Sequence, residues 1–480
     1  MTVVQETQPP RLCLPGRKLL VLQNPGRGSR NFLNGIIAGL GKLGVGHCVL
    51  ELQEIWDTNK TDTAGLVQRL SRILVEQRIG AVLSYGFNGM TDVPLDRGPM
   101  EGLRSFFEIR GIPHMMLWID HPQWHADLVG LSPALQGLFR SANCLHFLKS
   151  TAAATELERI VGWPNCFALA PGVEPAQFPV CAPPGAMAAK KEFDVVTICS
   201  EKGDLAEWLK EFVALDNPDP AAIRRVILDR VYAALDQLWQ QDVPQAMRPE
   251  VSALGRTWAA LKAGQPFLAA IRHWPALVEE FPGAAWYLTL EYPIYMKAVR
   301  ILWRLREWER LFYLAYLAKY FRVGVFGGDL SPMGLGPGGG VDYTQQSAIY
   351  ARGHVALTIP DGHDEEGLTL KAFELAASGV AMLHYRAETL GDYFVEGREV
   401  AVFSTPREAR EKVDALLDNA DRRQAMATAA HQRVLRDHRW ENRIEQMFQR
   451  ARLPLSAFCE PANAAARLSP PLTTPPTASR

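Results

Sequence analysis

The sequence contains little cysteine and no long hydrophobic run. Its seven cysteines are scattered, odd in number and never spaced as C-x-x-C, so they indicate neither a disulfide framework nor a zinc site. The N-terminal segment lacks a basic stretch followed by an apolar one, and no apolar run approaches the ~20 residues of a membrane-spanning helix. We therefore expect a cytoplasmic protein with no export signal and no membrane span.

Strong net charge and several enzyme motifs are also missing. A net charge of −1 gives no reason to expect nucleic-acid binding. The G-x-S-x-G turn of serine hydrolases and the G-x-x-x-x-G-K-[ST] loop of P-loop enzymes do not occur, which excludes both classes.

Short apolar runs alternate with helix-compatible stretches in the N-terminal part of the chain. This alternation is typical of βαβ units with a parallel sheet, and at 480 residues the chain is too long for one core. The predicted strands are KLLVLQNP (18–25), HCVLELQE (47–54), GAVLSYGF (80–87) and HMMLWID (114–120), and FRVGVFGGD (321–329) and HVALTIP (354–360) add strands to a second α/β unit.

Residues 204–320 have a different pattern, with long amphipathic stretches at 221–241 and 295–321. Apolar and aromatic residues recur there every three or four positions, which predicts a helical insertion. The Trp and Tyr stripe of this insertion has two interpretations. One is core packing of helix on helix, and the other is a surface for an acceptor or for a homodimer.

A glycine-rich loop, NPGRGSRNF, follows the first predicted strand. As a dinucleotide fingerprint it supplies Gly26 and Gly28 and has Glu51 near the acidic position, but Asn31 replaces the third glycine. This pattern incompletely supports an NAD-dependent oxidoreductase that uses the 24–51 loop. Alternatively, Gly26 and Arg30 face phosphates or an acceptor in a cleft, or the arginines of the loop are only solvated.

The segment EGLTLKAFELAASGV predicts a strand-to-helix turn with two acids, Glu366 at the helix N-terminus and Glu374 about two turns later. Eight helical residues would leave the two carboxylates rotated by only ~80°, so both can face one cleft. The N–H groups of Gly367, Leu368 and Thr369 would suit a diphosphate, because the first turn of a helix has no internal acceptors. The alternative is a helix-terminal Glu366 stabilised by the dipole and an exposed Glu374.

The strand end LWIDHPQWH supplies candidates for proton transfer. Ligands bind beyond the carboxyl ends of parallel strands, so Asp120 and His121 are predicted to project into the interdomain cleft. His121 titrates near neutrality and is our candidate general base, with Asp120 orienting it.

The C-terminal part of the sequence resembles a known family. EGLTLKAFELAASGVAML, FVEGREVAVF (394–403) and MATAAHQRVLRDHRWENRIEQM (426–447) resemble the C-terminal domain of GT-B glycosyltransferases, and more narrowly the CgeB-like spore-maturation group. That group carries an acidic-turn helix and a final H-x-W-x-x-R element. Matching residues here are Glu366, Glu374, His438, Trp440 and Arg443.

Two further segments resemble this family. FALAPGVEPAQFPV (167–180) is similar to its interdomain hinge, and FDVVTICS (193–200) to the first strand of its second domain. One position departs from the family, because Lys371 stands where Arg is usual and lacks the planar fork for two-point phosphate contact.

The resemblance implies a GT-B fold, in which two Rossmann-like α/β domains face a cleft, here with a helical insertion in the second domain. It implies a hexosyltransferase-type enzyme that moves a sugar from a nucleotide-sugar donor to a glycan, protein or small-molecule acceptor, such as a bacterial surface polysaccharide or a flagellar protein. No metal or cofactor is expected, because GT-B enzymes offset the leaving diphosphate with a helix dipole and basic side chains.

On this hypothesis Glu366 holds the sugar, Glu374 the ribose and Gly367–Thr369 the diphosphate. Lys371 and Lys202 add positive charge, while Asp120 and His121 act from the other domain. Retention or inversion of the anomeric configuration stays open. Besides the oxidoreductase, a glycosyltransferase-like fold that serves as a non-catalytic binding or scaffold protein remains an alternative.

The expected boundaries follow from these assignments. They are an N-terminal tail (1–16), an N-terminal Rossmann-like domain (17–175), a linker (176–192), a C-terminal nucleotide-sugar-binding domain (193–203 and 321–430), the helical insertion (204–320), C-terminal helices (431–459) and a disordered tail (460–480).

Overall fold

A computed structural model describes most of the chain. The described residues are 16–24, 26–88, 95–97, 103–122, 137–180, 191–199, 219–328, 330, 335, 341–364, 366 and 368–459. None of the helices in this part of the chain is long and apolar enough to cross a bilayer.

The N-terminal domain is built on a six-stranded parallel sheet in the order β2-β1-β3-β6-β7-β8. Its central strands are buried along their whole length, as expected for a parallel sheet covered by helices on both faces. The strands are β1 (Lys18–Gln23), β2 (His47–Glu51), β3 (Ile79–Tyr85), β6 (His114–Trp118), β7 (Cys144–Leu148) and β8 (Cys166–Ala168). The helices are α1 (Arg27–Lys42), α2 (Leu52–Thr61), α3 (Thr63–Glu76), α4 (Phe106–Ile109) and α6 (Thr151–Glu156), and a small hairpin pairs β4 (Leu95–Arg97) with β5 (Leu103–Ser105).

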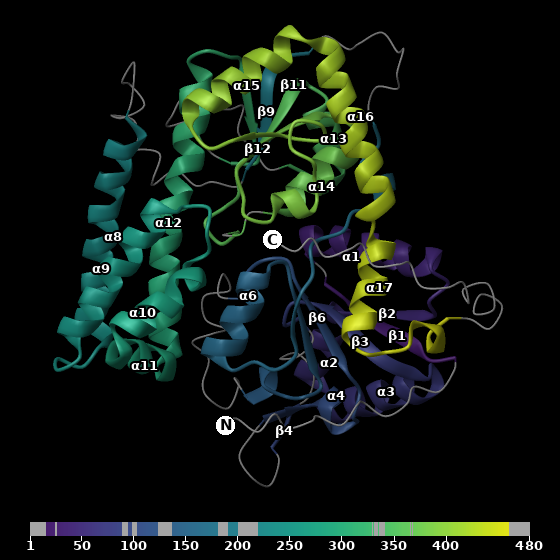
Figure 1. The fold of residues 1–480 in the computed structure, drawn as a ribbon. Helices are drawn as coiled ribbons and strands as arrows, with labels where there is room; N and C mark the ends of the chain where they lie inside the picture. The colour runs from purple at the N-terminus through teal and green to yellow at the C-terminus, as the bar shows by residue number, and fades with distance from the viewer. Residues whose placement is uncertain are drawn as a thin grey trace, which may run out of the picture.

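The C-terminal domain has a five-stranded parallel sheet in the order β10-β9-β11-β12-β13. Its strands are β9 (Phe193–Ile198), β10 (Val323–Phe326), β11 (Gly353–Thr358), β12 (Ala381–Tyr385) and β13 (Ala401–Phe403). Its helices are α13 (Gln346–Tyr350), α14 (Leu370–Ala377), α15 (Pro406–Asp418) and α16 (Ala420–Asp437). After α16, helix α17 (Trp440–Arg450) leaves this domain and packs against α1 (Figure 1).

A helical block lies between β9 and β10 in the sequence and beside both domains in space (Figure 1). It consists of α8 (Pro220–Asp242), α9 (Arg248–Gly264), α10 (Trp274–Glu280), α11 (Pro282–Leu290) and α12 (Tyr292–Ala318). The aromatic stripe is buried: Trp258 and Trp308 have no exposed surface, and Trp303 has 2%. The core-packing interpretation of the stripe therefore holds, because these side chains have no surface left for a partner.

The block contacts both domains. Tyr313 of α12 donates a hydrogen bond to the carbonyl of Ser404 in the C-terminal domain (2.8 Å). Tyr295 of the same helix donates to Glu156 of the N-terminal domain (2.8 Å). One continuous helix thus connects the two α/β domains at one side of the cleft.

The second connection between the domains is the chain crossing from α16 to α17. The segment 426–447 that resembles the family is not one helix, because the structure breaks it at His438 and Arg439 between α16 and α17. Val173 explains the break: its N–H donates to the carbonyl of His438 (3.0 Å), and its carbonyl accepts from the N–H of Trp440 (3.2 Å). The segment that leaves the N-terminal domain and the segment that returns to it are therefore hydrogen-bonded to each other where the chain passes between the domains.

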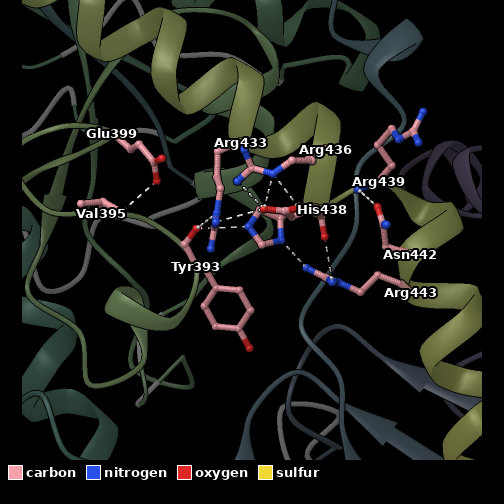
Figure 2. Close-up of polar contacts among 10 residues, drawn as sticks. Tyr393, Val395, Glu399, Arg433, Arg436, His438, Arg439, Asn442 and Arg443 are labelled. Carbon is pink, nitrogen blue, oxygen red and sulfur yellow. Dashed lines mark hydrogen bonds and ion pairs between the residues drawn. The ribbon is translucent and has the colours of Figure 1, made fainter. Parts of the chain in front are cut away.

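Buried polar groups fix this crossing (Figure 2). Arg443 donates to the carbonyl of Pro171 (3.1 Å) and to Nδ1 of His438 (2.8 Å). Because Nδ1 accepts, the proton of His438 lies on Nε2, which donates to the carbonyl of Tyr393 (3.1 Å). Burial, and then the charge of Arg443, lower the pKa of His438 to about 4. His438 is therefore neutral near pH 7.

Two parallel-sheet α/β domains that face each other, with the C-terminal helix returning to the first, form the GT-B fold. The predicted fold class is thereby confirmed.

Candidate functional site

A cavity of about 640 Å³ lies between the two domains, at the carboxyl ends of both sheets. Its N-terminal wall comes from α1 and from the ends of β3, β6 and β7: Ser29, Phe32, Tyr85, Ile119, Asp120 and Lys149. The C-terminal wall comes from the ends of β9 and β11, from α13 and α14, and from the loops beside them, and α12 of the helical block adds Arg310. Parallel strands collect ligand groups at this edge, so the cavity is the candidate site.

Glu374 is the most deeply buried acid of the C-terminal wall, with no exposed surface. Its Oε2 lies 3.1 Å from Nζ of Lys371, which also donates to Gln346 (2.9 Å). Its Oε1 makes no hydrogen bond to any described residue. Tyr343 lies against Glu374: burial, then the Glu374 charge, and then a hydrogen bond to the Glu374 side chain raise the pKa of the phenol well above its ordinary value.

Helix α14 begins later than the sequence suggested. We predicted a helix start at Gly367–Thr369, but α14 starts at Leu370 with Thr369 in extended conformation at the N-cap. Pairing at the preceding turn explains the difference, because the carbonyl of Glu366 accepts from both the N–H and the hydroxyl of Thr389. The rotation of ~80° predicted between the Glu366 and Glu374 carboxylates is therefore wrong, because it assumed that the whole segment is helical. Residues 366–369 precede the helix.

Thr369 faces the cavity and its Oγ1 is buried without a hydrogen-bond partner in the described part of the chain. Leu368 instead packs in the core of the C-terminal domain with 5% of its surface exposed. Of the three residues predicted to hold a diphosphate, Thr369 lines the cavity, Leu368 does not, and Gly367 lies outside the described residues.

Glu366 does not line the cavity. Its Oε1 contacts Nη2 of Arg272 in the helical block, and 1% of the residue is exposed. Burial raises the pKa of Glu366, while the backbone N–H of Ala152 and the charge of Arg272 oppose the increase. The structure thus places Glu366 where the block, α6 and the C-terminal domain meet, away from the predicted sugar contact.

Asp120 does project into the cavity, as we predicted from the end of β6. Its Oδ2 accepts from the hydroxyl of Tyr85 (3.1 Å), and its Oδ1 lies 3.4 Å from Nε2 of His363, which belongs to the other domain. Burial raises the pKa of Asp120, but the hydrogen bond with His363 and the charge of Lys149 outweigh it and hold the pKa below its usual range. Asp120 is therefore an ionised carboxylate held from both sides.

His121 is a correction to the sequence prediction, because its side chain is not part of the cavity wall. Its Nε2 lies 2.9 Å from Oε2 of Glu156, its ring packs edge-on to Trp303, and 6% of the residue is exposed. The side chain of His121 instead faces Glu156 of α6 and Trp303 of the helical block. The imidazole that meets Asp120 belongs to His363.

Two ion pairs involving the loop after β11 complete the site. Lys149 of the N-terminal domain contacts Oδ1 of Asp364, and Nη2 of Arg310 lies 3.0 Å from Oδ2 of Asp361. Burial lowers the pKa of Lys149 to about 8, although Asp120 and Asp361 oppose the decrease. Burial, and then the charge of Lys149, also lower the pKa of His363.

Two other predicted residues lie elsewhere, and a third falls outside the described part of the chain. Gly26 precedes α1 and is exposed, and Arg30 pairs with Glu51 beside the first strands. Neither residue lines the cavity. Lys202 lies outside the described residues.

Sequence reasoning missed Lys149, Arg310 and the pairing role of Asp361 and His363. Lys149 directly follows β7, and strand ends were the signal that located Asp120, so the same rule applied to the buried run CLHFL would have found it. Arg310 gave no such signal, because it lies on a long amphipathic helix among other arginines. Among the described residues, no group of three His, Cys, Asp or Glu side chains could hold a metal ion.

The C-terminal part of the sequence matches a family model, and solved structures are similar to the chain over most of its length. Residues 305–449 match the family model described as "Glycosyl transferase-like". No curated protein matches the sequence.

Several solved structures are similar over most of the chain. Sucrose-phosphate synthase from Thermosynechococcus elongatus is 10% identical with a TM-score of 0.46, covering 91% of this chain and 98% of that chain. A glycosyltransferase from Rickettsia africae is 8% identical with a TM-score of 0.44, covering 91% and 98%. Anabaena HepE, in complex with UDP and glucose, is 11% identical with a TM-score of 0.40, covering 90% and 98%.

The family match includes most of the C-terminal wall of the cavity, but not the residues at the end of β9. It begins within α12, so Arg310 lies inside it, as do Thr369, Lys371 and Glu374. Thr369 and Glu374, each with a buried oxygen that lacks a hydrogen-bond partner among the described residues, thus lie in the segment that matches this model.

Proposed function

We propose that the protein is a glycosyltransferase that moves a sugar from a nucleotide-sugar donor to a hydroxyl-bearing acceptor. The single observation behind this proposal is the state of Glu374. Its carboxylate is fully buried in the cavity wall, yet Oε1 has no hydrogen-bond partner among the described residues.

A buried carboxylate oxygen without a partner costs free energy, so its place in a cavity favours a ligand that donates to it. A ribose diol supplies two hydroxyl donors, which suits one carboxylate. We therefore propose that Glu374 binds the ribose of the donor.

The diphosphate would lie next to this ribose. Thr369 offers a buried hydroxyl without a partner at the start of α14, and Lys371 offers a positive charge in the first turn. The helix dipole also favours an anion there. The sugar would then extend toward the N-terminal wall of the cavity, where Asp120 would face the acceptor.

The finer assignments are part of the proposal. We propose a metal-independent hexosyltransferase of the cytoplasm, because basic side chains are available to offset the leaving diphosphate. We assign Asp120 of the N-terminal domain to the reacting centre, because it is charged and contacts His363. A homodimer through the helical block would have to use exposed residues such as Trp286 and Leu290 of α11, because the aromatic stripe is buried.

The first experiment is a screen. The purified chain is heated with UDP-, GDP-, ADP- and dTDP-hexoses, and with NAD(H), and its unfolding temperature is recorded. A ligand at 100 times its dissociation constant stabilises the folded state by ~2.7 kcal/mol. Donors that stabilise are then incubated with candidate acceptors, and release of the nucleoside diphosphate is measured.

Two variants separate the function classes. For a glycosyltransferase, Glu374→Gln should weaken nucleotide-sugar binding while Gly26→Val leaves it unchanged. For the oxidoreductase alternative, Gly26→Val should instead abolish NAD(H) binding. Gly26 has a φ of −63°, and a Cβ there would meet only side-chain atoms at 3.3 Å or more, so this variant should fold. Donor binding without any transfer would favour the scaffold alternative.

A further inference from the structure

Three positive charges converge on the cavity, one from each part of the fold. Lys149 directly follows β7 of the N-terminal domain, Arg310 lies on α12 of the helical block, and Lys371 lies in α14. Burial raises the pKa of Cys199 at the end of β9, and both Arg310 and Lys371 oppose that increase, so both charges act at the same place.

Each of these cations contacts an acid of the C-terminal domain, and Lys149 also interacts with the charge of Asp120 in its own domain. Lys371 contacts Glu374 on its own helix. Arg310 and Lys149 contact two acids of one short loop, Asp361 and Asp364, which follows β11. Both side chains of the Lys149–Asp364 pair are buried, at 8% and 7% exposure, so solvent does not weaken it.

The loop is held in place by the helical block. A Cβ on Gly362 would lie 2.7 Å from the carbonyl oxygen of Trp303 and 2.8 Å from its Cβ. Only glycine permits this approach, which keeps Asp361 beside Arg310 and Asp364 across the cleft beside Lys149. The acids are therefore positioned by packing, not only by charge.

We infer that Lys149 and Arg310 form a diphosphate-binding site, and that Asp364 and Asp361 neutralise these two cations until the diphosphate displaces them. This inference rests on the proposed function and assigns new residues to it. The site would receive the diphosphate between α12, the N-terminal domain and the start of α14.

The chemistry favours an exchange of this kind. A diphosphate carries more negative charge than a carboxylate and has more acceptor oxygens, and the planar fork of Arg310 suits two of them. Displacing Asp361 and Asp364 makes diphosphate binding less favourable, because both carboxylates lose their ion-pair partners. Removing either carboxylate charge should therefore strengthen diphosphate binding, whereas a purely structural role of the pair predicts weaker binding.

The test measures binding of inorganic pyrophosphate by calorimetry at fixed ionic strength, followed by UDP, GDP and ADP with the matching nucleosides. Asp364→Asn and Asp361→Asn should each lower the dissociation constant of pyrophosphate by about three- to tenfold. Lys149→Met should raise it by about ten- to a hundredfold. None of the three should change the affinity for a nucleoside. Asp242→Asn, which removes the acid from the exposed Lys297–Asp242 pair, is the matched control and should change nothing.

Equal or weaker pyrophosphate binding by both folded Asn variants would overturn the inference, as would unchanged binding by folded Lys149→Met. If nucleosides and nucleotides bind equally well in every variant, the ribose assignment survives and this diphosphate site falls. If the unmodified protein binds neither pyrophosphate nor any nucleotide, the proposed function and this inference fall together.

Discussion

Replacing Arg443 by methionine tests how the two domains are joined. The guanidinium is buried, with 3% of the residue exposed, and it donates to the carbonyls of Pro171 (3.1 Å) and Asp437 (3.4 Å) and to His438 (2.8 Å). Methionine has a similar length but no donor. The variant would leave these acceptors without their partner at the point where the chain passes between the domains.

The magnitude follows from the acceptors left behind. A buried acceptor without a partner costs about 1–3 kcal/mol, so three of them cost at least about 3 kcal/mol, and removal of one partner from a buried charged contact costs about 3–5 kcal/mol, which is the loss we expect. For 480 residues the entropy of unfolding is about 1 kcal/mol/K, so the melting temperature should fall by about 3–5 °C if the chain unfolds cooperatively. Differential scanning calorimetry at pH 7.5 measures this shift.

The control lies one helix earlier. Arg436 pairs with Asp437, but 63% of its side chain is exposed, so Arg436→Met should leave the melting temperature unchanged (Figure 2). Equal melting temperatures for the two variants would refute the reasoning, because burial of the Arg443 contacts would then contribute nothing.

Three further predictions concern acid, packing and assembly. His114, with a pKa of about 3, and His146, His384 and His438, each about 4, lie below the unfolded value of about 6.5, so the unfolded chain binds more protons between pH 6.5 and 4. The urea midpoint should therefore fall across this range and be nearly constant from pH 6.5 to 7, below the pH at which Lys149, with a pKa of about 8, adds its own dependence. In His438→Gln the free energy of unfolding should fall less steeply, by up to about 1.4 kcal/mol per pH unit. A pH-independent midpoint would contradict this. Gly362→Ala should destabilise the chain by about 1–3 kcal/mol in urea unfolding, whereas Gly391→Ala, where a Cβ meets open space, should not; equal stability of the two would refute the packing argument. If a homodimer forms through the helical block, Trp286→Lys should convert it to a monomer in light scattering, and a dimer that survives this change would place the interface elsewhere.

The sequence allowed the fold to be predicted because its strands are short apolar runs at regular intervals. The runs at 18–25, 47–54, 80–87 and 114–120 each overlap a strand of the N-terminal sheet. Hydrophobic periodicity of this kind reports burial directly. The H-x-W-x-x-R element that resembles the family lies where the chain passes from α16 to α17. No local pattern predicts the break of the helix at His438, because that break depends on hydrogen bonds with Val173, which lies far away in the sequence.

The candidate site was predicted only in part, for a physical reason. Asp120, Thr369, Lys371 and Glu374 line the cavity because strand and helix ends determine their positions. The directions of Glu366 and His121 depend instead on Arg272, Glu156 and Trp303, which no local pattern connects to them. The helical block supplies two of these partners and also Arg310, so its packing decides which residues reach the cavity.

The central claim is that Glu374 binds the ribose diol of a nucleotide in the interdomain cavity. The most direct measurement is a calorimetric cycle with a nucleoside diphosphate that binds and its 2′,3′-dideoxy analogue, using the unmodified protein and Glu374→Gln. We predict that the unmodified protein prefers the diol by ~1.5–3 kcal/mol and that most of this preference disappears in the variant. An equal preference for the diol in both proteins, with the variant folded, would contradict the account.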